Sequence, residues 1–295
     1  MLRAMPAESR RQGSLETTLC RKGLWASGPA QLSLPLDSQD LLGLVRASGT
    51  LKLTPDLEIL VWLTERWRHD RDPDGWVPFT LYELGAAVYG RKPNGNDRQR
   101  LRASLRRLVM VSVDITGWDP MTGELAPNVA AAGGRLIDWL RSDLDRLGPD
   151  PGAAELGALR GSTFQAQIPR WMRQQVAAGH VTYLDWGTLR ALDGLAKRLW
   201  VYLQAERFKP TGQGEEETWI KLGDRAYTTL GMNYGHERQA RAAIKRAGAA
   251  ICTVDTRYQS VTVERRPGGW AIVATRLRSR ERGAIRAAVR ASFDG

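Results

Sequence analysis

One order of elements occurs twice in this chain and constrains its fold more than any other feature. In each copy a helix with one apolar face is followed by a short strand, a second helix, a turn and a strongly basic third helix. The short strands are residues 76–79 and 219–222, and the basic helices begin at Asp97 and His236. The spacing of about 140 residues indicates two units of domain size rather than the short repeats of a solenoid.

The first copy has a clear beginning at Thr54 and Pro55, a good N-cap followed by a residue preset for a first helical turn. Apolar residues then recur at helical spacing: Leu57, Leu60, Leu63 and Trp67. After the short strand, Thr80 caps a second helix, which ends at the turn 90–96. The inward face of the third helix carries Leu101, Leu105 and Leu108. The alternating residues 109–115 predict a strand after it.

The second copy repeats this order. Its first helix carries Leu192, Leu195, Leu199 and Leu203. The turn 231–235 separates a short helix at 224–230 from a basic helix over 236–249, which rests on Ala240, Ile244 and Ala247. Residues 251–254, which include Cys252, predict the start of a sheet. Residues 261–265 and 270–275 predict two strands around the hairpin turn 266–269.

This order, with strands around a turn after the third helix, is typical of a winged helix-turn-helix domain. We therefore expect an α+β chain with two tandem winged helix-turn-helix domains. The predicted divisions are a flexible basic arm (1–30), a first winged domain (31–147), a linker (148–162), a second winged domain (163–278) and a basic C-terminal helix or tail (279–295).

The charge of the chain points to a polyanionic partner. Lysine and arginine number 43 against 32 acidic residues, which gives a formal net charge of +11. Composition alone does not separate DNA, RNA and a membrane surface as the partner. The placement of the charge on the two basic helices has to decide.

The basic helices carry most of their charge on one face. At 100° per residue, the inward leucines of the first helix leave an outward face with Arg98 and Arg100 on its flanks: Gln99, Arg102, Arg106 and Arg107. The second helix presents Arg238, Gln239, Arg241, Ala242, Lys245 and Arg246. Arginine can pair with guanine and glutamine with adenine in the major groove, and the small Ala242 permits close approach.

Two features beside the second helix add to this candidate DNA surface. Asn233 lies just before the helix, where a base or phosphate contact is within reach. Arg265 and Arg266 lie at the hairpin, where they are positioned either to reach phosphate or the minor groove or to block edge-to-edge aggregation. Each basic face, taken singly, can also be a merely solvated surface. Two such faces in the same position of two repeats favour DNA.

No motif in the sequence indicates catalysis, a metal site or a cofactor site. The chain has no phosphate-binding glycine loop, its histidines are isolated, and Cys20 and Cys252 stand far apart. The acidic residues at 70, 72 and 74 form a loop by their turn chemistry. No apolar run approaches the ~20 residues that span a bilayer, and residues 1–13 lack the apolar stretch of a secretory signal. We therefore expect a cytoplasmic, non-enzymatic protein.

The chain resembles plasmid replication initiator proteins of the tandem winged-helix, iteron-binding type. The resemblance covers roughly residues 50–278 and is carried by residues 168–171, 183–186 and 195–203, the last of which looks like the family's central helix (Leu-Ala-Lys-Arg-Leu-Trp-Val-Tyr-Leu). It departs from the family in the long loop 118–134 and the basic arm, which leaves the first domain's contacts and the dimer interface open.

The resemblance implies a function. Such proteins bind direct repeats (iterons) at an origin, promote opening of nearby duplex and recruit host replication proteins such as a helicase or initiator. It also implies self-association into dimers. A winged-helix transcriptional regulator without a replication role uses the same helices and stays an alternative. A nuclease or transposase is a third reading, which nicking of supercoiled DNA would support.

Overall fold

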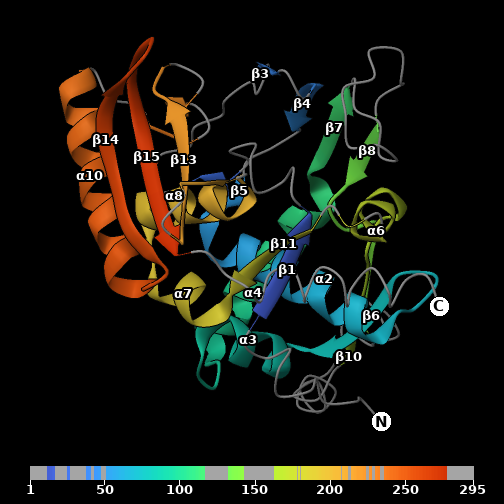
Figure 1. Cartoon of the computed structure of the whole chain (residues 1–295). Helices are drawn as coiled ribbons and strands as arrows, with labels where there is room; N and C mark the ends of the chain where they lie inside the picture. Colours follow the sequence, from blue (N-terminus) through green and yellow to red (C-terminus); the bar gives the residue numbers. More distant parts are fainter. Residues whose placement is uncertain are drawn as a thin grey trace.

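The structure of the chain is a computed structural model. It describes residues 12–16, 25–26, 38–40, 43–47, 51–116, 132–142, 163–206 and 208–277, except positions 178, 180, 212–213, 224–225, 228–229 and 233–235. The chain combines helices with mainly antiparallel sheets (Figure 1), so the predicted α+β class is confirmed.

The first copy of the repeat folds into three helices and a three-stranded sheet. A short turn η1 (Leu53–Leu57) leads into α2 (Glu58–Asp70), and β6 (Trp76–Thr80), α3 (Leu81–Tyr89) and α4 (Gly95–Met110) follow. The strands β9 (Trp139–Ser142) and β10 (Thr163–Gln167) complete the sheet, in the order β6-β10-β9. The last strand of this copy therefore lies between its first and second strands.

The second copy has the same topology. Its elements are α8 (Gly194–Ala205), β12 (Lys209–Pro210), β13 (Glu215–Lys221), α10 (Glu237–Val254), β14 (Tyr258–Arg266) and β15 (Gly269–Leu277). The sheet order is β12-β13-β15-β14, so β15 lies between β13 and β14 as β10 lies between β6 and β9. The helix predicted at 224–230 lies mostly outside the described residues. The shared strand order confirms the repeated winged arrangement that the sequence predicts.

The first copy differs from the prediction in how its wing is built. The expected strand 109–115 starts later, because α4 continues to Met110 and β7 spans Ser112–Thr116. β7 does not pair with β6. It joins a separate sheet with β8 (Ala132–Arg135), β4 (Gly43–Ala47) and β3 (Ser38–Asp40), in the order β3-β4-β7-β8. The winged sheet is completed only by β9 and β10, which pair antiparallel with each other.

The predicted linker 148–162 lies outside the described residues, on the connection between β9 and β10. Residues 163–167, predicted as the start of the second domain, pair with β6 and β9 in the sheet of the first copy. The two-domain division of the chain stays a prediction, but this strand belongs to the first sheet.

The third helix of the second copy is longer than predicted. α10 includes residues 251–254, which the alternating pattern assigned to a strand, and β14 begins only at Tyr258. The helical spacing of Ala240, Ile244 and Ala247 continues to buried Ile251. The helical period therefore prevails over the two-residue alternation that predicted a strand. Cys252 is therefore a half-buried helical residue rather than a strand residue.

Two short stretches of the predicted basic arm form strands. β1 (Gln12–Glu16) pairs antiparallel with β11 (Val181–Asp185), and β2 (Trp25–Ala26) pairs parallel with β5 (Leu51–Lys52). The rest of residues 1–30 lies outside the described residues, as do residues 279–295. The prediction of an arm without structure is wrong for these two stretches.

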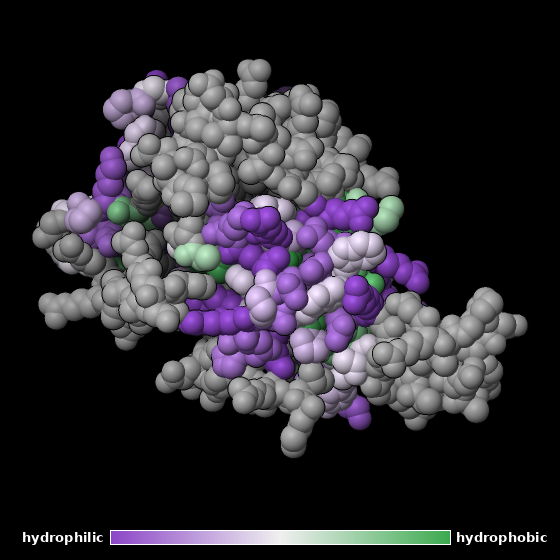
Figure 2. All heavy atoms as spheres, turned by 90° about the vertical axis from the view of Figure 1, so that its right-hand side faces the viewer, coloured by the Kyte–Doolittle hydropathy of each residue, from purple (hydrophilic) through white to green (hydrophobic). Residues whose placement is uncertain are grey.

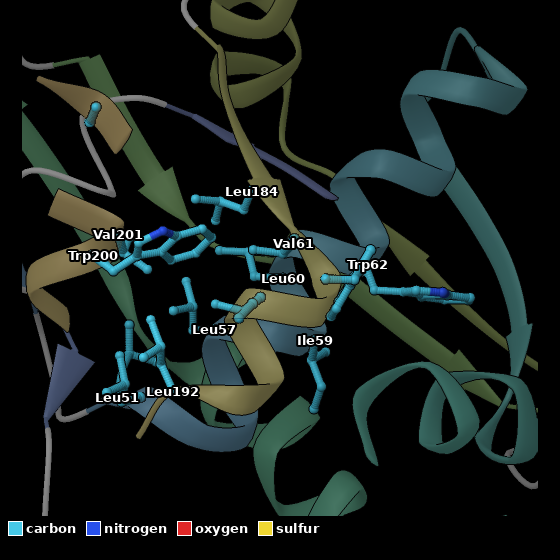
Figure 3. Packing of buried hydrophobic residues seen from close by; sticks show 14 of the residues in the cluster. Leu51, Leu57, Ile59, Leu60, Val61, Trp62, Leu184, Leu192, Trp200 and Val201 are labelled. Atoms are coloured by element: carbon cyan, nitrogen blue, oxygen red, sulfur yellow. The ribbon is translucent and has the colours of Figure 1, made fainter. Parts of the chain in front are cut away.

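The two copies share one buried cluster. α2 is buried on all sides from Glu58 to Trp67, as a helix in the middle of a core must be. Trp200 and Val201 of α8 lie among residues of α2, η1 and β11, as Figure 3 shows for Leu57, Leu60 and Leu184. The helices α6 (Arg170–Ala177) and α7 (Trp186–Ala191) flank β11 in the chain.

A buried ion pair crosses this core. Nζ of Lys197 on α8 lies 2.7 Å from Oε1 of Glu58 on α2, and both side chains are almost fully buried. Lys197 also donates to the hydroxyl of Thr54. The contact fixes the first helices of the two copies against each other, since an isolated charge in this position is costly.

On the side of α6 and β6 the described surface is mainly hydrophilic. Figure 2, seen from the side of α6 and β6, shows the described residues with only small, separate hydrophobic areas. No helix among the described residues is long and apolar enough to cross a membrane.

Candidate nucleic-acid interface

The turn before α4 is held in a fixed shape by its own side chains. Asn94 and Asp97 form a capping box, in which the Asn94 side chain accepts from the Asp97 N–H and the Asp97 carboxylate accepts from the Asn94 N–H. Arg91 donates to the same carboxylate at 2.7 Å. This bond, followed by that from Asn94, holds the pKa of Asp97 below its ordinary value. The entry of the chain into the basic helix is therefore rigid.

The helix before this turn packs closely against it. A β-carbon on Gly85 of α3 would lie 2.6 Å from Cβ of Pro93 in the turn, so only glycine permits the observed approach. α3 has its own capping box from Thr80 and Glu83. Together these contacts give the helix–turn–helix geometry that presents one helix to a groove.

One stripe of α4 faces solvent. Asp97, Leu101, Ser104, Leu105 and Leu108 are buried, and the opposite side exposes Asn96, Gln99, Arg100, Ala103, Arg106 and Met110. Gln99 and Arg106 lie in this stripe as predicted. Arg100, predicted on the flank, lies in it too, as do Asn96 and Ala103, which the sequence prediction did not include. The buried polar residues Asp97 and Ser104 set the phase of the helix, and a leucine-only pattern misses them.

Three predicted arginines of α4 lie outside the exposed stripe. Arg98 and Arg102 are half-buried on its flanks. Arg107 is committed to the interior: its guanidinium donates to both carboxylate oxygens of Asp56, at 2.6 and 2.9 Å, and to the Ser104 hydroxyl. Asp56 is fully buried. The prediction that Arg107 points outward is wrong, because a buried carboxylate requires a bonded counter-charge.

The stripe of α10 is described from His236 onward. Ala240, Ala243, Ile244, Ala247, Gly248 and Ile251 are buried. The exposed side carries Arg238, Gln239, Ala242, Lys245 and Arg246. All five were predicted to point outward, and the structure confirms that placement. Asn233, the other residue predicted near this helix, lies outside the described residues.

Arg241 is an exception on α10. Its side chain is 23% exposed and donates to Glu237 one turn earlier at 2.8 Å. Its guanidinium lies over the ring of Trp270 on β15, 4.4 Å from the ring centre. The predicted outward position of Arg241 is therefore only partly right, because the side chain lies down on the wing hairpin.

Within the part of the chain that the structure describes, the wing hairpin of the second copy presents one free arginine rather than two. Arg265 is exposed at the end of β14. Arg266 is half-buried and pairs with Glu217 of β13 at 3.1 Å and with Glu264 at 3.4 Å. Of the two predicted wing residues, Arg265 alone is placed to meet a partner in this arrangement.

The stripes of α4 and α10 match in composition. Each contains an adjacent glutamine and arginine, in reversed order in the two helices, then a small alanine one turn later and a basic residue one turn after that: Gln99, Arg100, Ala103 and Arg106 in α4, and Arg238, Gln239, Ala242 and Lys245 in α10. In each stripe the long side chains lie on either side of the small alanine. This arrangement lets the helix approach closely inside a groove about 12 Å wide.

The described residues hold no group of three or more histidine, cysteine or acidic side chains placed to bind a metal ion. The acidic residues at 70–74 act within the structure. The side chain of Asp72 accepts from the N–H groups of Asp74 and Trp76, and Asp70 binds Arg66. These carboxylates shape the loop between α2 and β6.

Comparison with known proteins gives distant structural likenesses, among them two structures of RctB domains. No family model matches the chain and no curated protein matches it. A crystal structure of domains 2 and 3 of RctB overlaps with a TM-score of 0.48 at 12% identity, covering 79% of this chain and 85% of that one. A second RctB structure of the same domains gives 0.43 at 10% identity, covering 82% and 88%.

Proposed function

We propose that this chain binds double-stranded DNA through the exposed stripes of α4 and α10, each lying in a major groove. One observation carries the proposal: two units with the same strand order expose an adjacent glutamine and arginine (in reversed order), an alanine and a basic residue at the same spacing on the same helix. A solvated surface has no reason to repeat this pattern at matching positions. Arginine and glutamine are also the side chains that read guanine and adenine edges in pairs of hydrogen bonds.

We propose further that the bound DNA is a set of direct repeats at a plasmid replication origin. The resemblance of residues 168–171, 183–186 and 195–203 to iteron-binding initiators supports this finer assignment. In this role the protein has no catalytic step of its own. It promotes opening of the neighbouring duplex, recruits host replication proteins and self-associates. Its place of action is the cytoplasm.

The first test is a footprint of the purified full chain on the DNA that flanks its own coding sequence. Protection of direct repeats beside an AT-rich tract is the expected result. Protection of a single palindrome, with repression of the adjacent promoter and no replication of a plasmid that carries the region, would make the chain a transcriptional regulator. Nicks in supercoiled DNA incubated with Mg²⁺ would point to an enzyme.

The second test separates base reading from charge. Arg246→Ala removes an exposed residue of the α10 stripe, and Arg170→Ala removes an exposed arginine of α6, with the same change of charge. We expect Arg246→Ala to weaken specific binding by about 1–3 kcal/mol and Arg170→Ala to leave it nearly unchanged. Equal effects of the two substitutions would remove α10 from the interface.

A further inference from the structure

Arg190 lies against the turn that precedes the proposed recognition helix α4. Gly90 ends α3 with a φ of +67°, the left-handed conformation that favours glycine. A β-carbon on Gly90 would lie 2.7 Å from Nη1 of Arg190, so the guanidinium sits directly on the glycine backbone. The backbone conformation favours glycine here, and the arginine occupies the space that a β-carbon would fill.

This arginine comes from the segment between the two copies of the repeat. It belongs to α7, more than ninety positions further along the chain, within the region predicted as the second domain. Its Nε donates to the carbonyl of Trp186 at 3.2 Å, which orients the rest of the side chain. The residue is exposed, and among the described residues no carboxylate pairs with it.

Two more cations stand at the same turn. Arg91 and Lys92 directly follow Gly90, and both are exposed. Arg91 is anchored by its bond to Asp97, so its position relative to the start of α4 is fixed. Arg91 and Arg100 both act on the pKa of Asp97 through their charges, which connects this group to the exposed stripe of α4. Lys92 has no carboxylate partner in the described part of the chain.

We propose that Arg190, Arg91 and Lys92 form a phosphate-binding cluster that seats the DNA backbone at the edge of the groove entered by α4. The proposal rests on the DNA-binding function proposed above. A helix that enters the major groove has a phosphate backbone on each flank, and exposed cations beside the start of the helix meet it first. The turn before α4 and the helix α7 thus build one contact surface together.

The cluster makes a particular prediction about how DNA is bound. Phosphate contacts position a protein without reading bases, so removal of Arg190 weakens binding to all sequences by a similar factor. It also lowers the dependence on salt, because each neutralised phosphate adds about 0.9 to the log–log slope. A purely structural role for Arg190, stabilising the end of α7, predicts neither effect.

The experiment measures binding of the full-length chain to a short duplex of arbitrary sequence, and to the flanking DNA, by fluorescence anisotropy across a salt series. Arg190→Ala and Arg190→Lys are compared with the wild type, and Arg170→Ala serves as the control of equal charge change. For Arg190→Ala we expect the slope of log affinity against log salt concentration to be smaller by about 0.9 than that of the wild type. The ratio of wild-type to variant affinity should therefore fall roughly 3.5-fold between 50 and 200 mM salt. Arg190→Lys should restore most of the slope.

Each result decides between the two proposals. If the wild type binds neither duplex, the proposed function fails and the cluster fails with it. If the wild type binds and Arg246→Ala weakens specific binding, but Arg190→Ala leaves slope and affinity equal to those of Arg170→Ala, the cluster alone is wrong. A lower melting temperature of Arg190→Ala with an unchanged salt slope would assign Arg190 to the stability of α7 instead.

Discussion

Arg241 on α10 lies over the indole ring of Trp270 on β15 while donating to Glu237 on its own helix. Trp270 follows the turn of the wing hairpin, so this contact ties the proposed recognition helix to the wing. Figure 1 shows α10 lying along β14 and β15. The angle between helix and wing determines which groove each can reach at the same time, and Arg241 contributes to that angle rather than to an open DNA surface.

Substitution of Arg241 should therefore act first on stability. Arg241→Ala removes a cation–π contact of a partly exposed pair, which stabilises the fold by about 0.5–1 kcal/mol. We expect a urea unfolding free energy lower by that amount and a smaller loss of DNA affinity than Arg246→Ala produces. An affinity loss as large as that of Arg246→Ala, with unchanged stability, would mean that Arg241 leaves Trp270 to contact DNA.

Arg106 and Arg107 are neighbours with opposite predicted effects. Arg107→Ala leaves the buried Asp56 carboxylate without its bidentate partner, and loss of one member of a buried pair costs roughly 3 kcal/mol. Arg106→Ala removes an exposed side chain and should leave the unfolding free energy within about 0.5 kcal/mol of the wild type. Its DNA affinity should fall. Chemical denaturation and DNA binding of the two variants check both statements, and the reverse result would contradict the orientation of α4.

The contrast between these two arginines shows how far sequence reasoning reaches. The spacing of Leu101, Leu105 and Leu108 locates the helix and its buried side. It does not resolve which of two adjacent arginines turns inward, because that depends on Asp56, a residue distant in the sequence that is buried beside the helix. The same limit applies to Arg266, whose partner Glu217 lies on another strand.

The wing of the first copy shows a second limit. Local alternation predicts a strand after α4, and β7 is close to that position. Which strands pair with one another depends on residues far apart in the sequence. β7 pairs with β4 and β8, whereas the winged sheet is formed by β6 with the later strands β9 and β10. In the second copy the partners are joined by a tight hairpin, so local turn chemistry was enough to predict β14 and β15.

Gly248 should be intolerant of even one added methyl group. A β-carbon there would lie 2.0 Å from the carbonyl oxygen of Val261 on β14. This clash is costly because a backbone atom cannot move aside as easily as the end of a flexible side chain. We expect Gly248→Ala to lower the unfolding free energy by about 1–3 kcal/mol. The control is Gly95→Ala in the first turn of α4, where no atom lies within 4 Å, and it should be neutral or slightly stabilising. Equal melting temperatures of both variants would refute the close approach of α10 to the sheet.

Asp255 should make the fold sensitive to acid. Burial pushes the pKa of Asp255 upward, but the hydrogen bonds from Arg257 and Trp200 outweigh it, so the pKa lies below the ordinary value of 3.8. The ionised carboxylate therefore stabilises the fold at neutral pH, and this contribution is lost as the pH falls through the folded-state pKa.

Asp255→Asn tests this contribution. The variant should be less stable than the wild type at neutral pH, and the difference should narrow as the pH is lowered below about 4. Thermal unfolding of both proteins across the acid range measures it. A difference that stays constant with pH would show that the carboxylate's charge is not what stabilises the native contacts of Trp200 and Arg257.

The pair of Lys197 and Glu58 should couple the two copies of the repeat into one cooperative unit. Lys197→Ala leaves Glu58 charged and buried, which costs about 3–5 kcal/mol, whereas replacing both residues by apolar ones of similar size is often neutral or stabilising. We therefore expect the double variant Lys197→Met with Glu58→Leu to be markedly more stable than Lys197→Ala.

Unfolding followed by fluorescence and by circular dichroism should give coincident transitions in the wild type. Separate transitions for the two probes would show that the copies unfold independently, and additive effects of the single substitutions Lys197→Met and Glu58→Leu would show that the pair contributes no coupling.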